Sequence, residues 1–494
     1  MRTSGVLMHL TSLPAPYGIG TMGAAAVGFV DFLAAAGQTY WQILPICPTG
    51  VGDSPYQTVS TFAGNPYLID LDDLQAQGLL GPEEYQPRDW GGDPSRVDFD
   101  LLSGQRYAVL RQACRRLLGQ PPEDYADFCA RQAHWLEDYA LFMAIKEARG
   151  GAPWQQWPAP LRLREEHALA AAREEYAGEA DFWKGVQYLF FRQWNRLKAY
   201  ANSRGVSIIG DLPIYVSGDS VDVWAWPRQF QLDEDLHPTE VAGCPPDGFS
   251  ELGQLWGNPL FDWAYMETTG YDWWIRRIRH QCRIYDVLRI DHFRGFESYY
   301  AIPYGAVDAR VGRWRPGPGM QLFRAVEAAL GPQPIIAEDL GTLTPEVYRL
   351  LEESGFPGMK VLEFAFDTRG GAGSDYLPHN IPRHSVAYTG THDNDTALGW
   401  LASAAPAAVD YARDYLRLGP WEPPNWTMMR AVWACPADTA IVQMQDLLDL
   451  GSQARMNRPS TVGGNWQWRA LPGFDNPQLA ARLRREVEIY CRLP

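Results

Sequence analysis

Short apolar segments rich in β-branched residues recur along the whole chain, and most of them end in polar or turn residues. Segments of this kind are typical of strands that are buried on both faces of a sheet. Eight such strands are predicted, at residues 5–10, 41–46, 207–216, 286–293, 334–340, 359–364, 385–393 and 440–447. Between many of them the apolar positions follow a helical period, at residues 24–37, 271–285, 319–330 and 345–354. Eight strands alternating with helices indicate a parallel sheet covered on both sides, and favour a (β/α)8 TIM barrel.

Two connections between the predicted strands are too long for a simple barrel. The second and third strands are about 160 residues apart, and the Trp- and Arg-rich part over 107–203 has helical periodicity. We therefore expect one barrel over 1–494 with an inserted, largely helical subdomain over 65–205. A second insertion is expected over 217–270. Its Gly- and Pro-rich stretch 241–249 is predicted to be a loop over the barrel mouth, because long loops in compact domains are usually functional.

The ends of the chain and its composition narrow the class of protein. Residues 478–493 have the pattern of a closing amphipathic helix, with Pro477 as its start signal. The apolar run near the N-terminus is too short for a signal peptide, and no apolar run approaches the roughly 20 residues needed to span a membrane. Seven scattered cysteines without a CxxC pair favour free thiols, so we expect a cytoplasmic protein.

Charge and aromatic content indicate the kind of ligand. The net charge of −16 argues against nucleic acid or an anionic membrane as partner, and a neutral ligand fits it better. The chain has 20 Trp, 24 Tyr and 19 Phe, many of them beside turn residues. Flat aromatic faces suit the C–H faces of sugar rings, although core packing is the commoner use of any single Trp.

One predicted strand carries an arginine and an aspartate among apolar residues. Arg289 and Asp291 are two positions apart, so their side chains share one face of the strand. Leaving either charge buried alone would cost on the order of 3–5 kcal/mol. Two interpretations follow: a structural ion pair that fixes the strand register, or a carboxylate held ionised for chemistry.

Acidic residues end four of the predicted strands, including this one, within 210–213, 289–292, 337–340 and 390–395. Catalytic groups of such barrels lie at the carboxyl ends of the strands. Carboxylates brought together raise one another's pKa and destabilise a fold, so their convergence is hard to explain as coincidence. The pattern therefore predicts a carboxylate-based active site. Asp291 beside Arg289 suits an ionised nucleophile, and Glu338 after an apolar run suits a protonated acid. Since their strands are neighbours, their carboxyl groups could lie about 5–5.5 Å apart, as in retaining glycosidases.

Each of these acids has an alternative interpretation. Glu338 could cap the following helix or bond a turn, and Asp393 and Asp395 could be Asx-turn or N-cap residues. The 392–395 run could bind a metal, but it lacks the Gly and distal Glu of a calcium loop, so we expect no metal. The 18–23 run matches GxGxxG, but Pro14 and Pro16 lengthen its turn, and no acidic residue ends the second strand. We therefore expect no nucleotide site.

Several motifs, taken together and in order, resemble the 4-α-glucanotransferases of the α-amylase clan, also called amylomaltases or disproportionating enzymes. The resemblance covers essentially the whole chain. The family lacks the separate C-terminal β-domain of amylases, and only about 45 residues follow the eighth strand here, against roughly 100 for a typical extra domain. The motifs occupy residues 12–14, 17–20, 53–57, 64–67, 210–216, 255–259, 289–295, 337–341 and 390–396.

The resemblance implies a role for particular residues. Asp291 would attack the anomeric carbon, Glu338 would act as acid and base, and Asp393 would stabilise the oxocarbenium-like transition state. Arg289 would keep Asp291 ionised. The further substrate-binding residues that it implies fall into three groups: Tyr56, Asp211 and His392 at the sugar that becomes covalently linked, Phe249, Gln254 and Trp256 over the acceptor side, and Ser54 with the weaker candidate Asn465.

The implied activity is that of a retaining glycosyltransferase. It would move α-1,4-glucan segments from maltooligosaccharides or amylose to the 4-hydroxyl of an acceptor glucan or glucose, through a covalent glycosyl-enzyme. We expect no cofactor and a monomer that disproportionates starch and maltooligosaccharides. An α-1,4-glucan hydrolase and a non-catalytic glucan-binding barrel are the alternatives, and exclusion of water by the 241–259 segment would separate transfer from hydrolysis.

Overall fold

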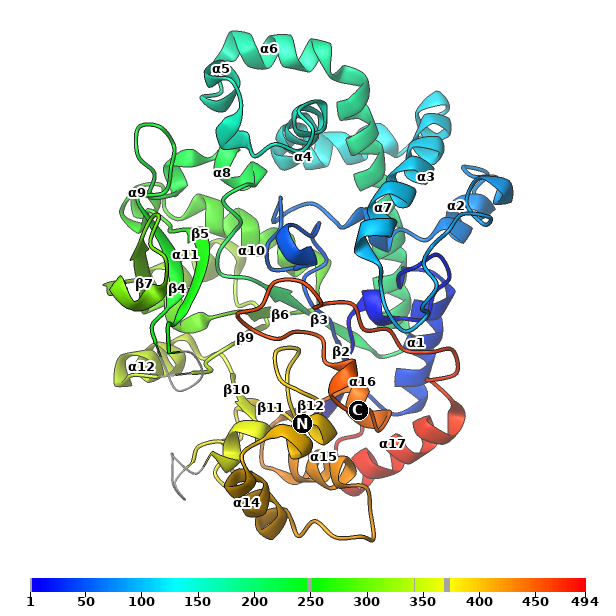
Figure 1. Ribbon diagram of the computed structural model, residues 1–494, viewed down its shortest axis with the longest axis vertical. Helices are drawn as coiled ribbons and strands as arrows, with labels where there is room; N and C mark the ends of the chain where they lie inside the picture. The colour runs from blue at the N-terminus through cyan, green and yellow to red at the C-terminus, as the bar shows by residue number, and fades with distance from the viewer. Residues whose placement is uncertain (1, 247–250, 342, 368–373) are drawn as a thin grey trace.

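The computed structural model describes residues 2–246, 251–341, 343–367 and 374–494, and a parallel barrel forms its centre (Figure 1). All eight predicted barrel strands are confirmed, and they follow one another around the sheet in the order β10-β11-β12-β1-β2-β3-β6-β9. They are shorter than predicted because the chain leaves the sheet before the predicted ends and continues in loops or short helices, as at Leu362–Phe366 and Met444–Leu447. Their bounds are β1 (Thr3–Leu7), β2 (Tyr40–Gln42), β3 (Ser207–Leu212), β6 (Val287–Ile290), β9 (Ile335–Ala337), β10 (Gly358–Val361), β11 (Ser385–Tyr388) and β12 (Thr439–Gln443).

The barrel closes between β9 and β10 without a full strand ladder. The Ala337 N–H donates to the Pro357 carbonyl at 3.0 Å. The buried carboxylate of Asp339, directly after Glu338, accepts the Met359 N–H at 2.5 Å and lies 3.3 Å from Lys360 Nζ. A side chain thus replaces part of the missing ladder beside the end of β9.

Helices cover the outside of the barrel, because each presents an apolar stripe to the sheet and a polar face to water. Five of them confirm the predicted helices: α1 (Ala24–Ala35), α10 (Asp272–Ile284), α11 (Met320–Leu330), α12 (Pro345–Ser354) and α17 (Pro477–Ile489). The other helices after β3 are α8 (Val221–Ala225), α9 (Trp263–Thr268), α13 (Ala397–Ser403), α14 (Pro406–Leu416), α15 (Pro424–Ala434) and α16 (Met444–Leu447). Within the described ranges no helix is long and apolar enough to cross a membrane.

A layer of helices lies between β2 and β3, within the insertion predicted over 65–205. It comprises α2 (Leu71–Ala76), α3 (Phe99–Gly119), α4 (Tyr125–Ala148), α5 (Ala159–Arg162), α6 (Glu166–Glu175) and α7 (Ala177–Ser203), several of them along the upper edge of Figure 1. The fully buried Arg106 of α3 donates to the carbonyls of Tyr67 and Ile69 and so ties this layer to the chain leaving the barrel. The bounds of a subdomain at 65 and 205 stay a prediction.

A second, antiparallel sheet lies beside the barrel and was not predicted. Its order is β5-β4-β7-β8, with bounds β4 (Glu240–Cys244), β5 (Gln254–Pro259), β7 (Ser298–Pro303) and β8 (Arg313–Pro316). The prediction of a loop over 241–249 is therefore wrong for residues 241–244, which pair with both β5 and β7. Gly243 and Cys244 thus belong to a short central strand. Residues 247–250 lie outside the described residues.

Candidate active site

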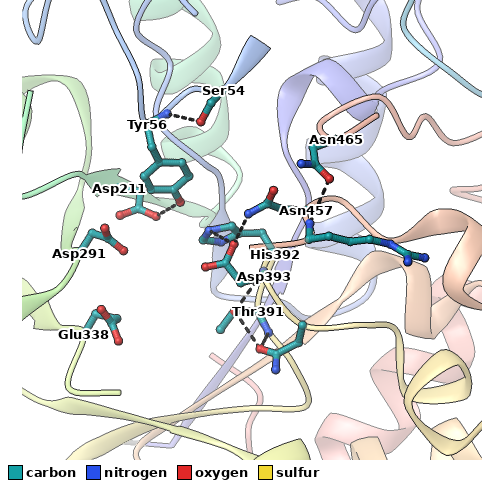
Figure 2. A network of polar contacts seen from close by, with 12 residues as sticks. Ser54, Tyr56, Asp211, Asp291, Glu338, Thr391, His392, Asp393, Asn457 and Asn465 are labelled. Carbon is teal, nitrogen blue, oxygen red and sulfur yellow. Dashed lines mark hydrogen bonds and ion pairs between the residues drawn. The ribbon is translucent and has the colours of Figure 1, made fainter. Parts of the chain in front are cut away.

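Four acidic side chains from the strand ends meet at the mouth of the barrel (Figure 2). The ladder places Asp211 of β3 directly opposite Arg289 of β6, and Ile290 opposite Ala337 of β9. The next residues keep this register, because the Asp291 N–H donates to the Leu212 carbonyl and the Glu338 N–H to the Ile290 carbonyl, both at 3.0 Å. Neighbouring strand ends thus bring Asp211, Asp291 and Glu338 to one side of the mouth, while Asp393 after β11 faces them in Figure 2.

Arg289 binds two of these carboxylates at once. Its Nη1 lies 2.7 and 2.6 Å from the two oxygens of Asp211 and 3.1 Å from Asp291 Oδ1. The side chains of Arg289 and Asp211 are 4% and 0% exposed, whereas that of Asp291 is 27% exposed. The pairing expected between Arg289 and Asp291 is present, but Asp211 is the closer partner. Burial lowers the pKa of Arg289, yet Asp211 and Asp291 raise it well above its usual value.

Asp291 and Glu338 share one electrostatic environment. Burial raises the pKa of Asp291 well above its usual value, against the lowering effect of Arg289. Burial also raises the pKa of Glu338, although Arg289 and two backbone N–H groups lower it. Burial and mutual repulsion thus disfavour two charges, while the guanidinium in contact with Asp291 favours one.

The backbone around Glu338 fixes its carboxyl group. Its Oε2 accepts the His292 N–H at 2.7 Å, and its Oε1 accepts the Leu340 N–H at 2.9 Å. His292 has the left-handed conformation, with φ 50° and ψ 49°. The alternative that Glu338 bonds a turn is therefore borne out, whereas the cap of α12 is formed at Thr344.

Asp393 projects from the turn between β11 and α13. The Asn394 side chain closes this turn by accepting the Thr391 N–H at 2.9 Å, and the Thr396 side chain caps α13. Asp395 accepts the Thr396 N–H at 2.8 Å. The turn and cap roles considered for Asp393 thus fall to its neighbours, and its carboxylate instead accepts Asn457 Nδ2 at 2.6 Å.

The three residues expected around the reacting sugar come together. Tyr56 donates its hydroxyl to Asp211 Oδ2 at 2.7 Å and stacks on the His392 ring, with centroids 5.1 Å apart. Burial and Asp211 raise the pKa of Tyr56 well above its usual value, so the phenol keeps its proton. Burial lowers the pKa of His392, which favours the neutral ring. Ser54 supports this group by accepting the Tyr56 N–H at 3.2 Å.

The residues expected near the acceptor are placed less completely. Trp256 of β5 donates its indole N–H to Gln254 Oε1 at 3.0 Å, and its ring meets the His292 ring edge-on at 4.9 Å. The small sheet therefore reaches the end of β6. Phe249 lies outside the described residues. Asn465 is buried and bonds its own loop, accepting the Arg458 N–H at 3.0 Å.

Three residues of the site were not among the predicted ones. His292 supplies a backbone donor to Glu338, and Asn457 supplies an amide donor to Asp393, while Arg455 Nη2 donates to the Asp393 carbonyl at 2.6 Å. The sequence signal for His292 was its place beside Asp291. No comparable signal marks Arg455 and Asn457, which lie on an irregular segment far along the chain.

The GxGxxG run, which was not expected to bind a nucleotide, has a structural role. In the GxGxxG run, the Gly20 N–H donates to the Thr11 carbonyl and the Met22 N–H to the Leu68 carbonyl, both at 3.0 Å. These amides thus bond within the fold. Among the residues that the structure describes, no group of three or more His, Cys, Asp or Glu side chains could hold a metal ion.

A (β/α)8 barrel with paired carboxyl groups at its strand ends has the groups that glycosidase-type chemistry requires. Comparison with known proteins specifies the class. A family model described as 4-alpha-glucanotransferase matches residues 8–473. The chain is 49% identical to the 4-alpha-glucanotransferase of Thermus thermophilus over 505 residues, covering 100% of this chain and 99% of that protein. It is 46% identical to that of Clostridium butyricum over 487 residues, covering 98% and 100%.

A solved structure agrees with these relatives. The amylomaltase from Streptococcus agalactiae in complex with acarbose matches with a TM-score of 0.97 and 44% identity, covering 100% of both chains. The chain belongs to the 4-alpha-glucanotransferase family. The expected fold and activity are thereby confirmed, and the hydrolase and the non-catalytic barrel are not favoured.

Proposed function

We propose that Asp291, Glu338 and Asp393 carry out retaining transfer of α-1,4-glucan segments. Asp291 attacks the anomeric carbon, the glycosidic bond breaks, and Glu338 gives its proton to the leaving oxygen. Glu338 then takes the proton of an acceptor 4-hydroxyl, whose oxygen attacks the same carbon and releases Asp291. Asp393 stabilises the positive charge that develops on the sugar in both steps.

The protonation states follow from the contacts of the two carboxyl groups. Burial raises the pKa of both Asp291 and Glu338, which disfavours charge on both carboxyl groups at once. The direct contact of Arg289 with Asp291, at 3.1 Å, favours the charge there. Glu338 then keeps the proton that the leaving oxygen needs. Two buried carboxyl groups at the ends of neighbouring strands, with Arg289 in direct contact with Asp291, are the observation that carries the proposal.

The surrounding residues would bind the sugar chain on either side of the reacting bond. Tyr56, Asp211 and His392 form a connected group beside the nucleophile, which suits the sugar that becomes covalently linked. Trp256 and Gln254 lie on the small sheet at the end of β6, where an aromatic face can cover the acceptor and exclude water. Ser54, Phe249 and Asn465 stay predicted substrate-binding residues.

The substrates and setting are also proposed. Maltooligosaccharides, amylose and other α-1,4-glucans fit the family, and acarbose, bound by the Streptococcus agalactiae relative, is the ligand of choice for the site. No disulfide joins any of the seven cysteines, all of which lie in the described ranges, and this supports a cytoplasmic setting. Disproportionation of starch and maltooligosaccharides is the role proposed for the protein there. The described acid, base and nucleophile come from one chain, so a monomer suffices for activity.

Incubation with maltotriose tests the activity and its assignment. Transfer yields glucose and longer maltooligosaccharides with almost no gain of reducing ends, whereas hydrolysis raises reducing ends steadily and a binding protein leaves maltotriose unchanged. Asp291→Asn should lower turnover by at least about 10⁴-fold, because it removes the nucleophile. Retained binding of acarbose by this variant would show that the site is still folded. Substantial activity of Asp291→Asn would mean that the nucleophile is misassigned.

A further inference from the structure

The carboxylate of Asp393 is held by a segment more than 60 residues further along the chain. Asn457 Nδ2 donates to Asp393 Oδ1 at 2.6 Å, and the Asn457 N–H donates to the His392 carbonyl at 3.1 Å (Figure 2). His392 Nε2 lies 3.4 Å from the same Oδ1. Within the described residues, the side-chain contacts of this carboxylate therefore converge on one oxygen. The Asp393 side chain stays 46% exposed, so its other oxygen can face a sugar.

Arg455 holds both partners of this contact. Its Nε donates to the Asn457 carbonyl at 2.7 Å, and its Nη2 donates to the Asp393 carbonyl at 2.6 Å. Its Nη1 lies 3.9 Å from Asp395 Oδ2, which also accepts a hydrogen bond from the Ser452 hydroxyl. A planar guanidinium spanning two carbonyls fixes the distance between two loops, which the flexible ammonium of lysine would not do.

The turn that carries Asp393 does not need this contact for its own formation. Asn394 closes the turn and Thr396 caps α13, both from within the turn. The segment between α16 and α17 passes across the middle of the barrel in Figure 1, and the contacts above join it to the end of β11. Asn457 therefore adds the shortest contact to the Asp393 side chain, and it acts on the direction of that side chain rather than on the turn.

We propose that Asn457, held by Arg455, is a positioning residue for Asp393 in glucan transfer. The amide fixes one oxygen of the carboxylate, so that the other oxygen meets the charge developing on the sugar. This inference rests on the proposed role of Asp393. It extends that role to two residues that do not touch the reacting atoms.

Kinetics of disproportionation test the proposal, with maltotriose and with α-maltosyl fluoride, whose fluoride leaves without help from an acid. Asn457→Ala should lower kcat about 10- to 100-fold with both donors and change KM less than about threefold, since misdirection of a catalytic group affects turnover more than binding. Arg455→Lys should lower kcat about tenfold, because lysine keeps the charge but lacks the planar set of donors that binds two carbonyls at once. Gln453→Ala, an exposed side chain of the same segment, should match the wild type.

A pH profile separates positioning from a merely structural role. Asn457→Asp keeps the shape of the side chain but places a second carboxylate against Asp393 Oδ1. At low pH a proton shared by the two restores the hydrogen bond, and at higher pH the two charges repel. The ratio of variant to wild-type kcat should therefore be highest at acid pH and fall as pH rises. A constant ratio would overturn the proposal, and this variant serves if Asn457→Ala folds poorly.

Asp393→Ala distinguishes failure of this inference from failure of the mechanism. If Asp393→Ala keeps wild-type kcat, the proposed role of Asp393 is wrong. If it loses kcat while Asn457→Ala and Asn457→Asp keep it, only the positioning role is wrong. The double variant Asp393→Ala with Asn457→Ala completes the comparison, assayed with α-maltosyl fluoride. Its kcat should be less than about twofold below that of Asp393→Ala alone, because both changes remove the same function. Fully multiplicative defects would show that Asn457 acts elsewhere.

Discussion

The active site has two halves that hold their charges in different ways. In the strand half, Asp211, Arg289, Asp291 and Glu338 lie on or directly after neighbouring strands, and Arg289 and Asp211 are almost fully buried. In the loop half, Asp393 and His392 lie on a turn that the 455–466 segment holds in place, and the Asp393 side chain is 46% exposed. One half is fixed by strand register and ion pairing, and the other by hydrogen bonds from the amide of Asn457 and the guanidinium of Arg455.

This difference matches what each half is proposed to do. A nucleophile and an acid must stay aligned with one carbon through bond breaking and bond making, which favours the rigid strand ends. The stabilising carboxylate meets a sugar that enters, reacts and leaves, which favours an accessible turn. Residues remote in sequence can therefore change the position of Asp393 with little effect on the barrel. A substitution in the strand half, by contrast, also changes the stability of the barrel.

The largest effect is expected for Arg289→Met. This change leaves the carboxylate of Asp211, which is 0% exposed, without its cation, and it removes the charge that favours ionised Asp291. The free energy of unfolding should fall by about 3–5 kcal/mol, and transfer should be abolished. Urea denaturation followed by fluorescence, together with the maltotriose assay, measures both effects.

Arg455→Met is the matched change in the loop half. Its side chain is 23% exposed and its guanidinium binds carbonyls, so the free energy of unfolding should fall by only about 1 kcal/mol while kcat still drops. Equal losses of stability in the two arginine variants would remove the distinction between the halves.

The next effect is a pH dependence of the free energy of unfolding, which arises from Asp446, a buried residue in contact with the strand end and the helix beside the loop half. Asp446 is 1% exposed and accepts the Thr389 hydroxyl at 2.8 Å and the Ala397 N–H at 2.7 Å. Burial and, less strongly, Asp395 raise its pKa to about 6, although these two hydrogen bonds lower it. The folded chain thus holds a proton that the unfolded chain releases above about pH 4. Stability from this group is full below about pH 4 and is lost as pH rises through about 6, by up to about 3 kcal/mol.

Asp446→Asn should flatten this decline, as measured by denaturation midpoints from pH 4 to 7. Part of the decline should remain, since burial also raises the pKa of the neighbouring Glu363. Asp410→Asn, on an exposed position of α14, controls for the loss of one acidic side chain. An unchanged slope in Asp446→Asn would show that the proton is held elsewhere.

The strand half could be predicted from the sequence, because buried parallel strands are continuously apolar and acids at their ends stand out. What could not be predicted was the closer pairing of Arg289 with Asp211, since this depends on a register across two strands 78 residues apart. The small sheet was missed for another reason. Its strands are partly exposed and contain Gly and Pro, so their composition resembles that of loops.

The loop half could be predicted only in part. The run from His392 to Asp395 marked a polar strand end, but nothing in the sequence connects it to Asn457, which is 64 positions away. A neutral amide on an irregular segment has no periodicity, and its donor role depends on how the segment returns across the barrel. Long-range contacts made by loops are therefore the part of this site that only the structure supplies.

The smallest effects are expected from two glycines, one in each half. In the strand half, a Cβ on Gly210 would lie 2.1 Å from ring atoms of Tyr285, which is itself buried. Gly210→Ala should cost about 1–3 kcal/mol through overpacking and should lower kcat, because it shifts the neighbouring Asp211. In the loop half, Gly463 has φ +83° and no atom within 4 Å of an added Cβ, so Gly463→Ala should cost about 1 kcal/mol from backbone strain. Denaturation midpoints and kcat of both variants measure the contrast. A larger loss of stability in Gly463→Ala would mean that the loop half is packed as tightly as the strands, and that its accessibility does not reflect looser support.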